Sequence, residues 1–255
     1  MTLGYTTLGH GDERVLILHD WSCDHTTYDP VTPFLDGTRF TYVFADLRGY
    51  GLSRQIEGKY TVEEASRDSL ELADSLGWDE FHVIGHSMTG MVSQRIALDA
   101  AGRVKSAVAV CPVSAAGFPM NEATWSFFQT VTEEDAAYRE MMRSLCSGLL
   151  SERWLDEKTR RNRATTAPQC RKAYLEMWSQ TNFASEVRGL PTPYLILTGE
   201  HDIEGLRADA MKDTFLAMHP NAELKVIPNS GHYPMQECPP FFATVIEEFL
   251  GRHAA

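Results

Sequence analysis

Gly85-His86-Ser87-Met88-Thr89-Gly90 is the segment that decides the fold. It follows the apolar run at residues 81–84 and precedes a stripe of apolar residues at helical spacing, which places it at a strand-to-helix turn. A sharp turn of this kind lifts a serine hydroxyl above the edge of a sheet and needs small flanking residues. The segment therefore predicts that Ser87 is a nucleophile, and the alternative is a plain turn between a strand and a helix.

A nucleophilic serine needs a base, because its hydroxyl is unreactive near neutral pH without one. Asp202 and His232 each follow an apolar, strand-like run farther along the chain. Since catalytic groups in open α/β sheets gather at the carboxyl edge of the strands, we expect these side chains to meet Ser87 there. His232 would act as general base and then acid, and Asp202 would orient it. Glu200 is a weaker candidate for the acid.

The developing oxyanion needs two hydrogen-bond donors. One is expected to be the backbone N–H of Met88, directly after the nucleophile, where the start of a helix leaves N–H groups free. The other is expected from the loop after the first apolar run, and the N–H of Trp21 is the candidate.

Outside this segment, the chain alternates between strand and helix patterns. Continuous apolar runs at 15–18, 40–45 and 104–110 predict strands that are buried on both faces of a parallel sheet. After a long break, the pattern resumes with a helix over 206–218 and a final helix over 241–252. We therefore expect an α/β fold, with a mostly parallel central sheet flanked by helices.

The long break falls after the strand ending near Val110 and contains helical stripes but no strand-like run. We expect residues 113–185 to form a helical cap inserted in a core domain made of residues 1–112 and 186–255. The basic stretch at 158–163 is expected to be a solvated helix face. Substrate pockets are mostly apolar, so candidates to line one are Trp125, Met141, Met142 and Trp178.

The composition restricts the possible functions. The 255 residues are 43% hydrophobic, and 23 Lys and Arg against 35 Asp and Glu give a net charge of −12, which disfavours nucleic acid or an anionic membrane as partner. Five cysteines without a C-x-x-C pair, and the absence of H-E-x-x-H, predict neither a disulfide framework nor a metal site. With no secretory signal and no apolar run long enough for a membrane span, we expect a cytoplasmic monomer or homodimer with a small-molecule substrate.

Taken together, these motifs resemble the α/β-hydrolase superfamily, in its branch with a short helical cap. The resemblance covers nearly the whole chain and rests on His19-Asp20-Trp21, on the segment Asp-Leu-Arg-Gly-Tyr-Gly-Leu-Ser at 46–53, and on residues 85–88, 199–202 and 231–232. It implies hydrolysis without a cofactor. Combined with the apolar cap, it predicts a serine hydrolase that cleaves a small to medium, largely apolar carboxylic ester or lactone through an acyl-enzyme on Ser87.

Two residues depart from the usual pattern of this family, which has glycine at both positions. A carboxylate at Asp20 would oppose the oxyanion if it pointed toward it, so we expect Asp20 to point away and hydrogen-bond its own loop. The alternative is that Asp20 contacts the substrate or positions water. Thr89 is β-branched and is expected to crowd the contact between helix and strand, which Gly90 relieves.

Two other functions remain open. The segment Trp21-Ser22-Cys23-Asp24-His25 resembles the matching loop of cofactor-free ring-opening dioxygenases of the same fold, but those usually carry their acid where this chain has Cys111-Pro112. Capped relatives that serve as slow-turnover signalling receptors also keep the three catalytic residues. Similar dehalogenases and epoxide hydrolases place an aspartate at the position of Ser87, which disfavours their chemistry here.

Overall fold

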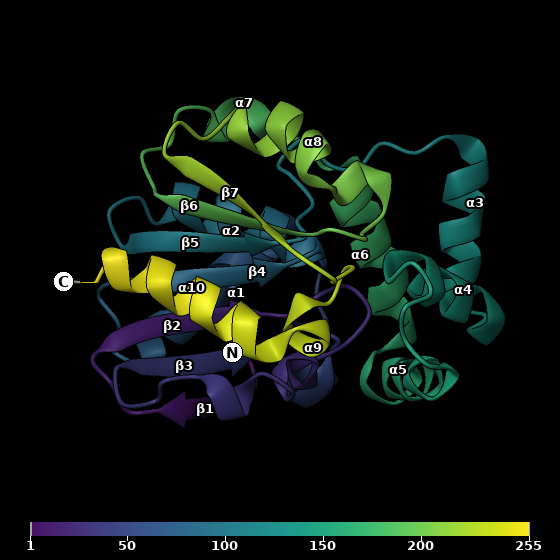
Figure 1. Cartoon of the computed structure of the whole chain (residues 1–255), viewed down its shortest axis with the longest axis horizontal. Coiled ribbons are helices and arrows are strands. Elements are labelled where there is room, and N and C mark those ends of the chain that lie inside the picture. Colours follow the sequence, from purple (N-terminus) through teal and green to yellow (C-terminus); the bar gives the residue numbers. More distant parts are fainter. Residues whose placement is uncertain (1, 255) are drawn as a thin grey trace.

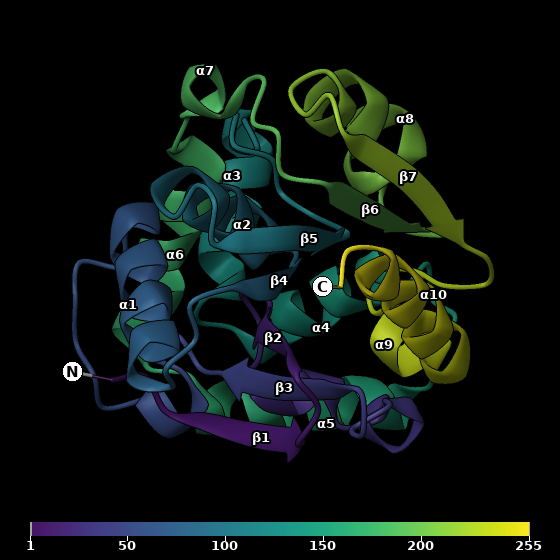
Figure 2. The same cartoon turned by 90° about the vertical axis from the view of Figure 1, so that its left-hand side faces the viewer.

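A seven-stranded sheet forms the centre of the computed structural model, which describes residues 2–254. The strand order is β1-β3-β2-β4-β5-β6-β7, and Figure 2 shows the strands side by side in this order. Only β1 is antiparallel, to its neighbour β3. The expected fold class is therefore confirmed. The strands are β1 (Tyr5–Gly9), β2 (Glu13–Leu18), β3 (Phe40–Ala45), β4 (Phe81–His86), β5 (Val104–Val110), β6 (Tyr194–Gly199) and β7 (Ala222–Ile227).

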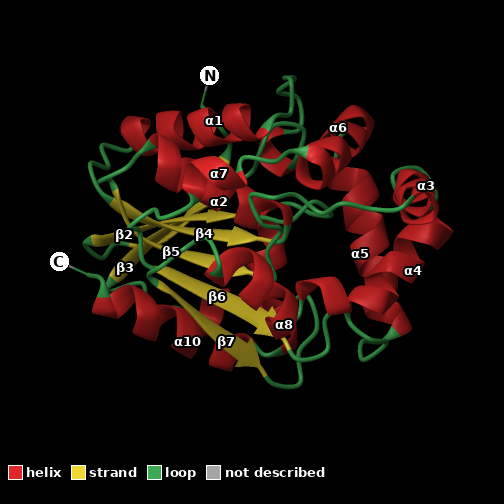
Figure 3. Cartoon of the chain, turned by 90° about the horizontal axis from the view of Figure 1, so that it is seen from above, coloured by secondary structure: helices red, strands yellow, loops and turns green. Residues whose placement is uncertain are grey.

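Helices cover both faces of the sheet. Figure 3 shows α1 (Val62–Ser75) and α2 (Met88–Asp99) on one face and α10 (Pro239–Arg252) on the other. Every residue of β4 and β6 is buried as a result, which explains why these strands are continuous apolar runs in the sequence. Among residues 2–254, no helix has the length and apolar character needed to cross a bilayer.

Between β5 and β6 the chain forms helices only. These are α3 (Glu122–Val131), α4 (Asp135–Leu145), α5 (Glu152–Thr165), α6 (Pro168–Gln180) and the short α7 (Ala184–Val187). In Figure 1, α3 to α6 lie together beyond the carboxyl ends of the parallel strands, whereas α7 lies apart from them and contacts α2. We refer to α3 to α6 as the inserted helices. They lie at the edge of the sheet where the sequence places the catalytic groups.

Two elements differ from the sequence-based expectations. β1 is the exposed edge strand, and because it buries no continuous apolar run it gave no strand signal. The helix expected over 206–218 is broken, since α8 spans only Ala208–Met211 and a π-helical turn follows at Lys212–Leu216. The apolar residues Met211, Phe215 and Met218 are all buried, so the pattern identified the buried face correctly but not the helix type.

The turn that carries Ser87 has a strained backbone. Ser87 has a φ of 55° and a ψ of −114°, a combination that non-glycine residues rarely adopt. Its N–H donates to Val110 O at 2.8 Å, and its carbonyl accepts from Gly90 N and Val113 N at 2.9 and 3.0 Å. These bonds tie the turn to the end of β5. A Cβ at Gly85 would lie 2.1 Å from Thr89 O, so the close approach of strand and helix requires glycine there.

Thr89 stabilises this turn through its hydroxyl rather than crowding it. The hydroxyl oxygen accepts a hydrogen bond from His86 N at 2.9 Å, and it lies 3.1 Å from Leu18 O and 2.9 Å from His19 O, to which it can donate. It thereby links the end of β4 to the end of β2. The close approach occurs at the next residue, Gly90, where a Cβ would lie 2.3 Å from Pro112 Cβ.

Replacing Thr89 with valine removes this hydroxyl and keeps the shape of the side chain. We expect Thr89→Val to lower the free energy of unfolding by about 1–3 kcal/mol, because His86 N–H loses its buried acceptor. Urea denaturation measures the change. The matched control is Thr244→Val on the exposed face of α10, which should change stability by less than about 0.5 kcal/mol. Equal effects in the two variants would contradict the assigned role of Thr89.

Candidate active site

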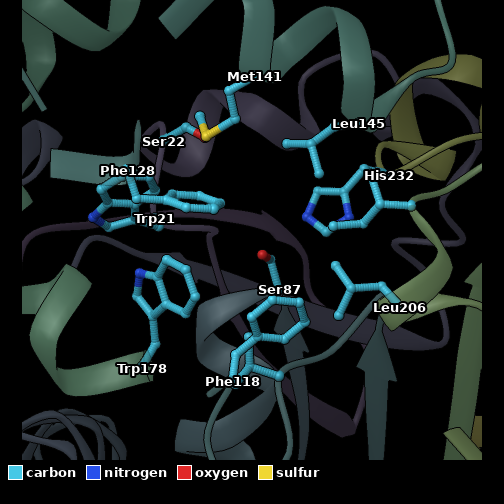
Figure 4. A pocket seen from close by; sticks show the side chains of 12 residues that line it. Trp21, Ser22, Ser87, Phe118, Phe128, Met141, Leu145, Trp178, Leu206 and His232 are labelled. Atoms are coloured by element: carbon cyan, nitrogen blue, oxygen red, sulfur yellow. The ribbon is translucent and has the colours of Figure 1, made fainter. Parts of the chain in front are cut away.

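A small cavity, of about 40 Å³, lies at the carboxyl edge of the sheet, between the sheet and the inserted helices. Figure 4 shows the side chains that surround it. Ser22, Ser87 and His232 contribute hydroxyl and imidazole groups, and the other described lining residues are apolar or aromatic. Those residues are Trp21, Val113, Phe118, Phe128, Met141, Leu145, Trp178, Ile203 and Leu206.

Ser87 and His232 face the same space. In Figure 4 the Ser87 hydroxyl points into the cavity, with the imidazole of His232 on the neighbouring wall. Ser87 is placed there by the strained turn before α2, and His232 by the loop after β7. Within residues 2–254 the Ser87 hydroxyl makes no hydrogen bond, so it is free to approach a ligand; such bonds often tighten only when substrate is bound.

Asp202 fixes the other ring nitrogen of His232, Nδ1. The Nδ1–H of His232 donates to Asp202 Oδ2 at 2.8 Å, which leaves Nε2 as the proton acceptor. Asp202 Oδ1 accepts from Ile203 N at 2.7 Å, and both side chains are almost fully buried. Burial alone would lower the pKa of His232, but the charge and hydrogen bond of Asp202 raise it above its ordinary value. The pair is therefore suited to hold a proton taken from a hydroxyl.

Glu200, the rival acid, does not contact this imidazole. Its carboxylate accepts from Asn229 N at 2.9 Å, on an exposed part of the chain. Cys111, at the end of β5, is buried with a φ of 43°. Its sulfur and the ligand atoms of Asp202 and His232 lie within 4.8 Å of one another, a spacing that a metal could use, but the acid and the imidazole are already hydrogen-bonded to each other.

Two backbone N–H groups beside Ser87 are free. Neither Trp21 N–H nor Met88 N–H donates a hydrogen bond to any group within residues 2–254. The peptide group before Trp21 is fixed by His19, whose Nδ1–H donates to Asp20 O at 2.7 Å while its Nε2 accepts from Leu47 N at 3.0 Å. Open, oriented donors at these two positions are what an oxyanion site requires.

Of the pocket residues expected from the sequence, the structure brings Met141 and Trp178 to the cavity but not Asp20, Met142 or Trp125. Met142 is one position along α4 from Met141, so it faces elsewhere and packs its sulfur 3.6 Å from Tyr233 Oη. Trp125 lies in outer hollows beside α6. Asp20 is 1% exposed, and its carboxylate accepts hydrogen bonds from its own loop. The expectation that Asp20 hydrogen-bonds its own loop is therefore confirmed.

Other lining residues were missed by the sequence analysis. Leu145 lies four residues after Met141 on α4, and this helical spacing could have identified it. Phe128 could have been found in the same way from the apolar face of α3. Phe118, Ile203 and Ser22 lie on loops, where no periodicity gives a signal.

Comparison with known proteins gives the family. A model of the alpha/beta hydrolase family matches residues 15–245, so the chain belongs to the alpha/beta hydrolase family. It is similar to a pimeloyl-[acyl-carrier protein] methyl ester esterase of Nitrosomonas europaea, with 27% identity over 94% of this chain and 96% of that protein. A hydrolase from Oleispira antarctica has the same fold, with a TM-score of 0.86, 18% identity, and coverage of 98% of this chain and 94% of that chain. A thermophilic esterase from Thermogutta terrifontis gives a TM-score of 0.81 and 23% identity over 99% and 94% of the two chains.

Titration of His232 tests the geometry of this site without any substrate. We expect the imidazole to titrate above the ordinary value of 6.5, and Asp202→Asn to lower its pKa, because the charge that favours the protonated ring is removed while the burial remains. NMR of ring-labelled histidines measures both values. Glu200→Gln is the control and should leave the titration of His232 unchanged. If Glu200→Gln lowered the pKa of His232 and Asp202→Asn left it unchanged, Glu200 would be the acid.

Proposed function

We propose that this protein hydrolyses carboxylic esters or lactones with a small to medium, largely apolar acyl group, through an acyl-enzyme on Ser87. The observation that carries the proposal is the buried hydrogen bond from His232 to Asp202 at 2.8 Å, in a cavity that His232 shares with the Ser87 hydroxyl. Membership in the hydrolase family and similarity to a methyl ester esterase over most of both chains agree with this reaction class.

The proposed cycle has two steps. In the first, Ser87 Oγ attacks the ester carbonyl carbon while His232 Nε2 accepts the hydroxyl proton, and Asp202 stabilises the resulting imidazolium. The N–H groups of Trp21 and Met88 bind the oxyanion, and the alcohol leaves with the proton from His232. In the second step, water attacks the acyl-enzyme, gives its proton to His232 and releases the acid, which restores Ser87. A lactone follows the same course, with the alcohol and the acid in one product.

The shape and chemistry of the cavity support a neutral acyl group. The cavity is small, with a volume of about 40 Å³, which favours the small end of the proposed range of acyl groups. Apart from the imidazole of His232, no ionisable acid or base is among the described residues that line it, so a charged acyl chain would lose hydration without gaining a partner. Aromatic rings form one wall, where Trp178 packs edge-on against Trp21 and Phe128 at 5.6 and 5.4 Å between ring centres.

The alternatives have less support from the geometry. The ring-opening dioxygenases of this fold usually carry their acid after the strand that corresponds to β5, whereas here Asp202 follows β6 and Cys111 ends β5. A slow signalling receptor would share the same three side chains, so only its turnover distinguishes it from an esterase.

Removing the nucleophile tests the proposal directly. Ser87→Ala should lower the hydrolysis of p-nitrophenyl butyrate by about 10³-fold or more, because the Ser87 hydroxyl supplies the attacking oxygen. Ser126→Ala, on the exposed face of α3, is the control and should keep the wild-type rate. Equal rates in Ser87→Ala and wild type would reject the assignment. A single turnover would favour the receptor, and oxygen uptake with a hydroxyquinolone-type substrate would favour the dioxygenase.

Enlarging the cavity should change the choice of substrate. Trp178→Ala removes an aromatic wall, and we expect the preferred p-nitrophenyl ester to lengthen by about two to four carbons, since each buried methylene contributes about 0.8 kcal/mol. The control is Trp125→Ala, which removes the same side chain from an outer hollow and should leave the chain-length profile unchanged. A shift in the control alone would place the acyl group outside this cavity. The measurement is kcat/KM for a series of esters.

A further inference from the structure

The loop after β2 carries an aspartate, Asp20, where the family usually has glycine, and this carboxylate organises the loop. Asp20 Oδ1 accepts from Ser22 N at 3.1 Å and from Cys23 N at 2.8 Å. The side chain is 1% exposed, so the bonds are shielded from water. Loop residues 21 to 23 offer three consecutive N–H groups, and Asp20 occupies the second and third. Only the N–H of Trp21 remains open.

The inserted helices form hydrogen bonds with the same loop. Trp21 Nε1 donates to Arg171 O in α6 at 2.8 Å, and Asn162 Nδ2 in α5 donates to Ser22 O at 2.7 Å. Tyr50 Oη donates to Trp21 O at 2.9 Å from the core side. Since the carbonyls of Trp21 and Ser22 are both occupied, the peptide planes of the loop cannot rotate freely. The open N–H therefore has a fixed direction.

A lysine of α5 is buried close to this loop, although the basic stretch at 158–163 was expected to be solvated. Lys158 is 4% exposed, and its Nζ has no hydrogen-bond partner within residues 2–254. The Nζ lies 4.0 Å from the centre of the Tyr233 ring, a cation–π geometry. Tyr233 Oη lies 3.0 Å from Ser22 Oγ, in the loop that Asp20 organises.

The charge of Lys158 acts on Asp20. Burial would raise the pKa of the Asp20 carboxyl, but Lys158, then His86 and the hydroxyl of Tyr233, lower it to about 2. A buried ammonium without hydrogen bonds is costly unless an opposite charge is near. The Asp20 carboxylate is the opposite charge on this side, and Tyr233 connects the two groups: its ring contacts the Lys158 ammonium, and its hydroxyl lies beside Ser22 Oγ, which is 3.5 Å from Asp20 Oδ2.

We propose that Asp20 and Lys158 act as one buried charged unit: Asp20 is a positioning residue that leaves the Trp21 N–H as the open donor among loop residues 21 to 23, and Lys158 offsets the carboxylate charge that would otherwise oppose the oxyanion. The oxyanion part of this inference rests on the proposed hydrolase function. The pairing of the two charges does not, because it concerns the folded protein alone.

Three variants test the unit with p-nitrophenyl butyrate. Lys158→Met should lower kcat about 10- to 100-fold with KM within about threefold, since an uncompensated carboxylate then lies near the developing negative charge. Asp20→Asn keeps an oxygen acceptor for the loop and should lower kcat less. The double variant Asp20→Asn/Lys158→Met has neither charge, so its kcat should exceed that of Lys158→Met by about fivefold or more. Lys212→Met, on the surface, is the control and should behave as wild type.

Thermal unfolding of the same variants separates the two parts of the inference. Each single variant should lower Tm by about 5 °C or more, and the double variant should lower Tm by clearly less than the sum of the two. Additive losses in Tm together with a kcat of the double variant no higher than that of Lys158→Met would overturn the proposal. If the wild-type protein hydrolysed no ester, the proposed function would fail, and non-additive Tm values would still establish the charge pair.

Discussion

The backbone at Ser87 is the constraint on which the rest of the site depends. A φ of 55° is unfavourable for serine, and it persists because the surrounding structure fixes both sides of the turn. β5 and the segment after it bond the Ser87 peptide groups, and the Thr89 hydroxyl links the ends of β4 and β2. The same turn points the hydroxyl into the cavity and starts α2, which leaves the Met88 N–H free. The proposed nucleophile and one proposed oxyanion donor thus follow from a single local geometry.

The sheet then brings the remaining groups to this turn. Asp202 and His232 come from loops after β6 and β7, which are adjacent and parallel, so their carboxyl ends lie at the same edge as Ser87. Strand order therefore explains how residues separated by more than a hundred positions form one site. The Asp202–His232 hydrogen bond joins two loops of the core, and α4 adds to its placement, because the N–H of His232 donates to Leu145 O at 3.0 Å.

The arrangement of catalytic candidates at the ends of buried strands explains which features the sequence analysis could predict. Buried parallel strands are visible as apolar runs, and catalytic residues follow those runs at short, regular offsets, so Ser87, Asp202 and His232 could be placed from their neighbours. The lining of the cavity could not be placed in the same way. Met141 and Met142 are adjacent and equally apolar, yet one faces the cavity and the other packs on Tyr233, because the rotation of α4 is set by tertiary contacts. An exposed edge strand such as β1 buries no run at all.

Two buried carboxylates near one oxyanion site need different partners. In the proposed reaction, Asp202 faces an imidazole that becomes positive, so its charge would favour the transition state. Asp20 accepts from backbone N–H groups that stay neutral, so we propose that its charge is offset by Lys158 of α5, which lies against the Tyr233 ring beside this loop. The Asp202–His232 hydrogen bond is made between two loops of the core, whereas the ammonium of Lys158 comes from α5. If this proposal holds, the inserted helices do more than enclose the substrate: they supply the charge that makes an aspartate tolerable in the loop proposed to bind the oxyanion.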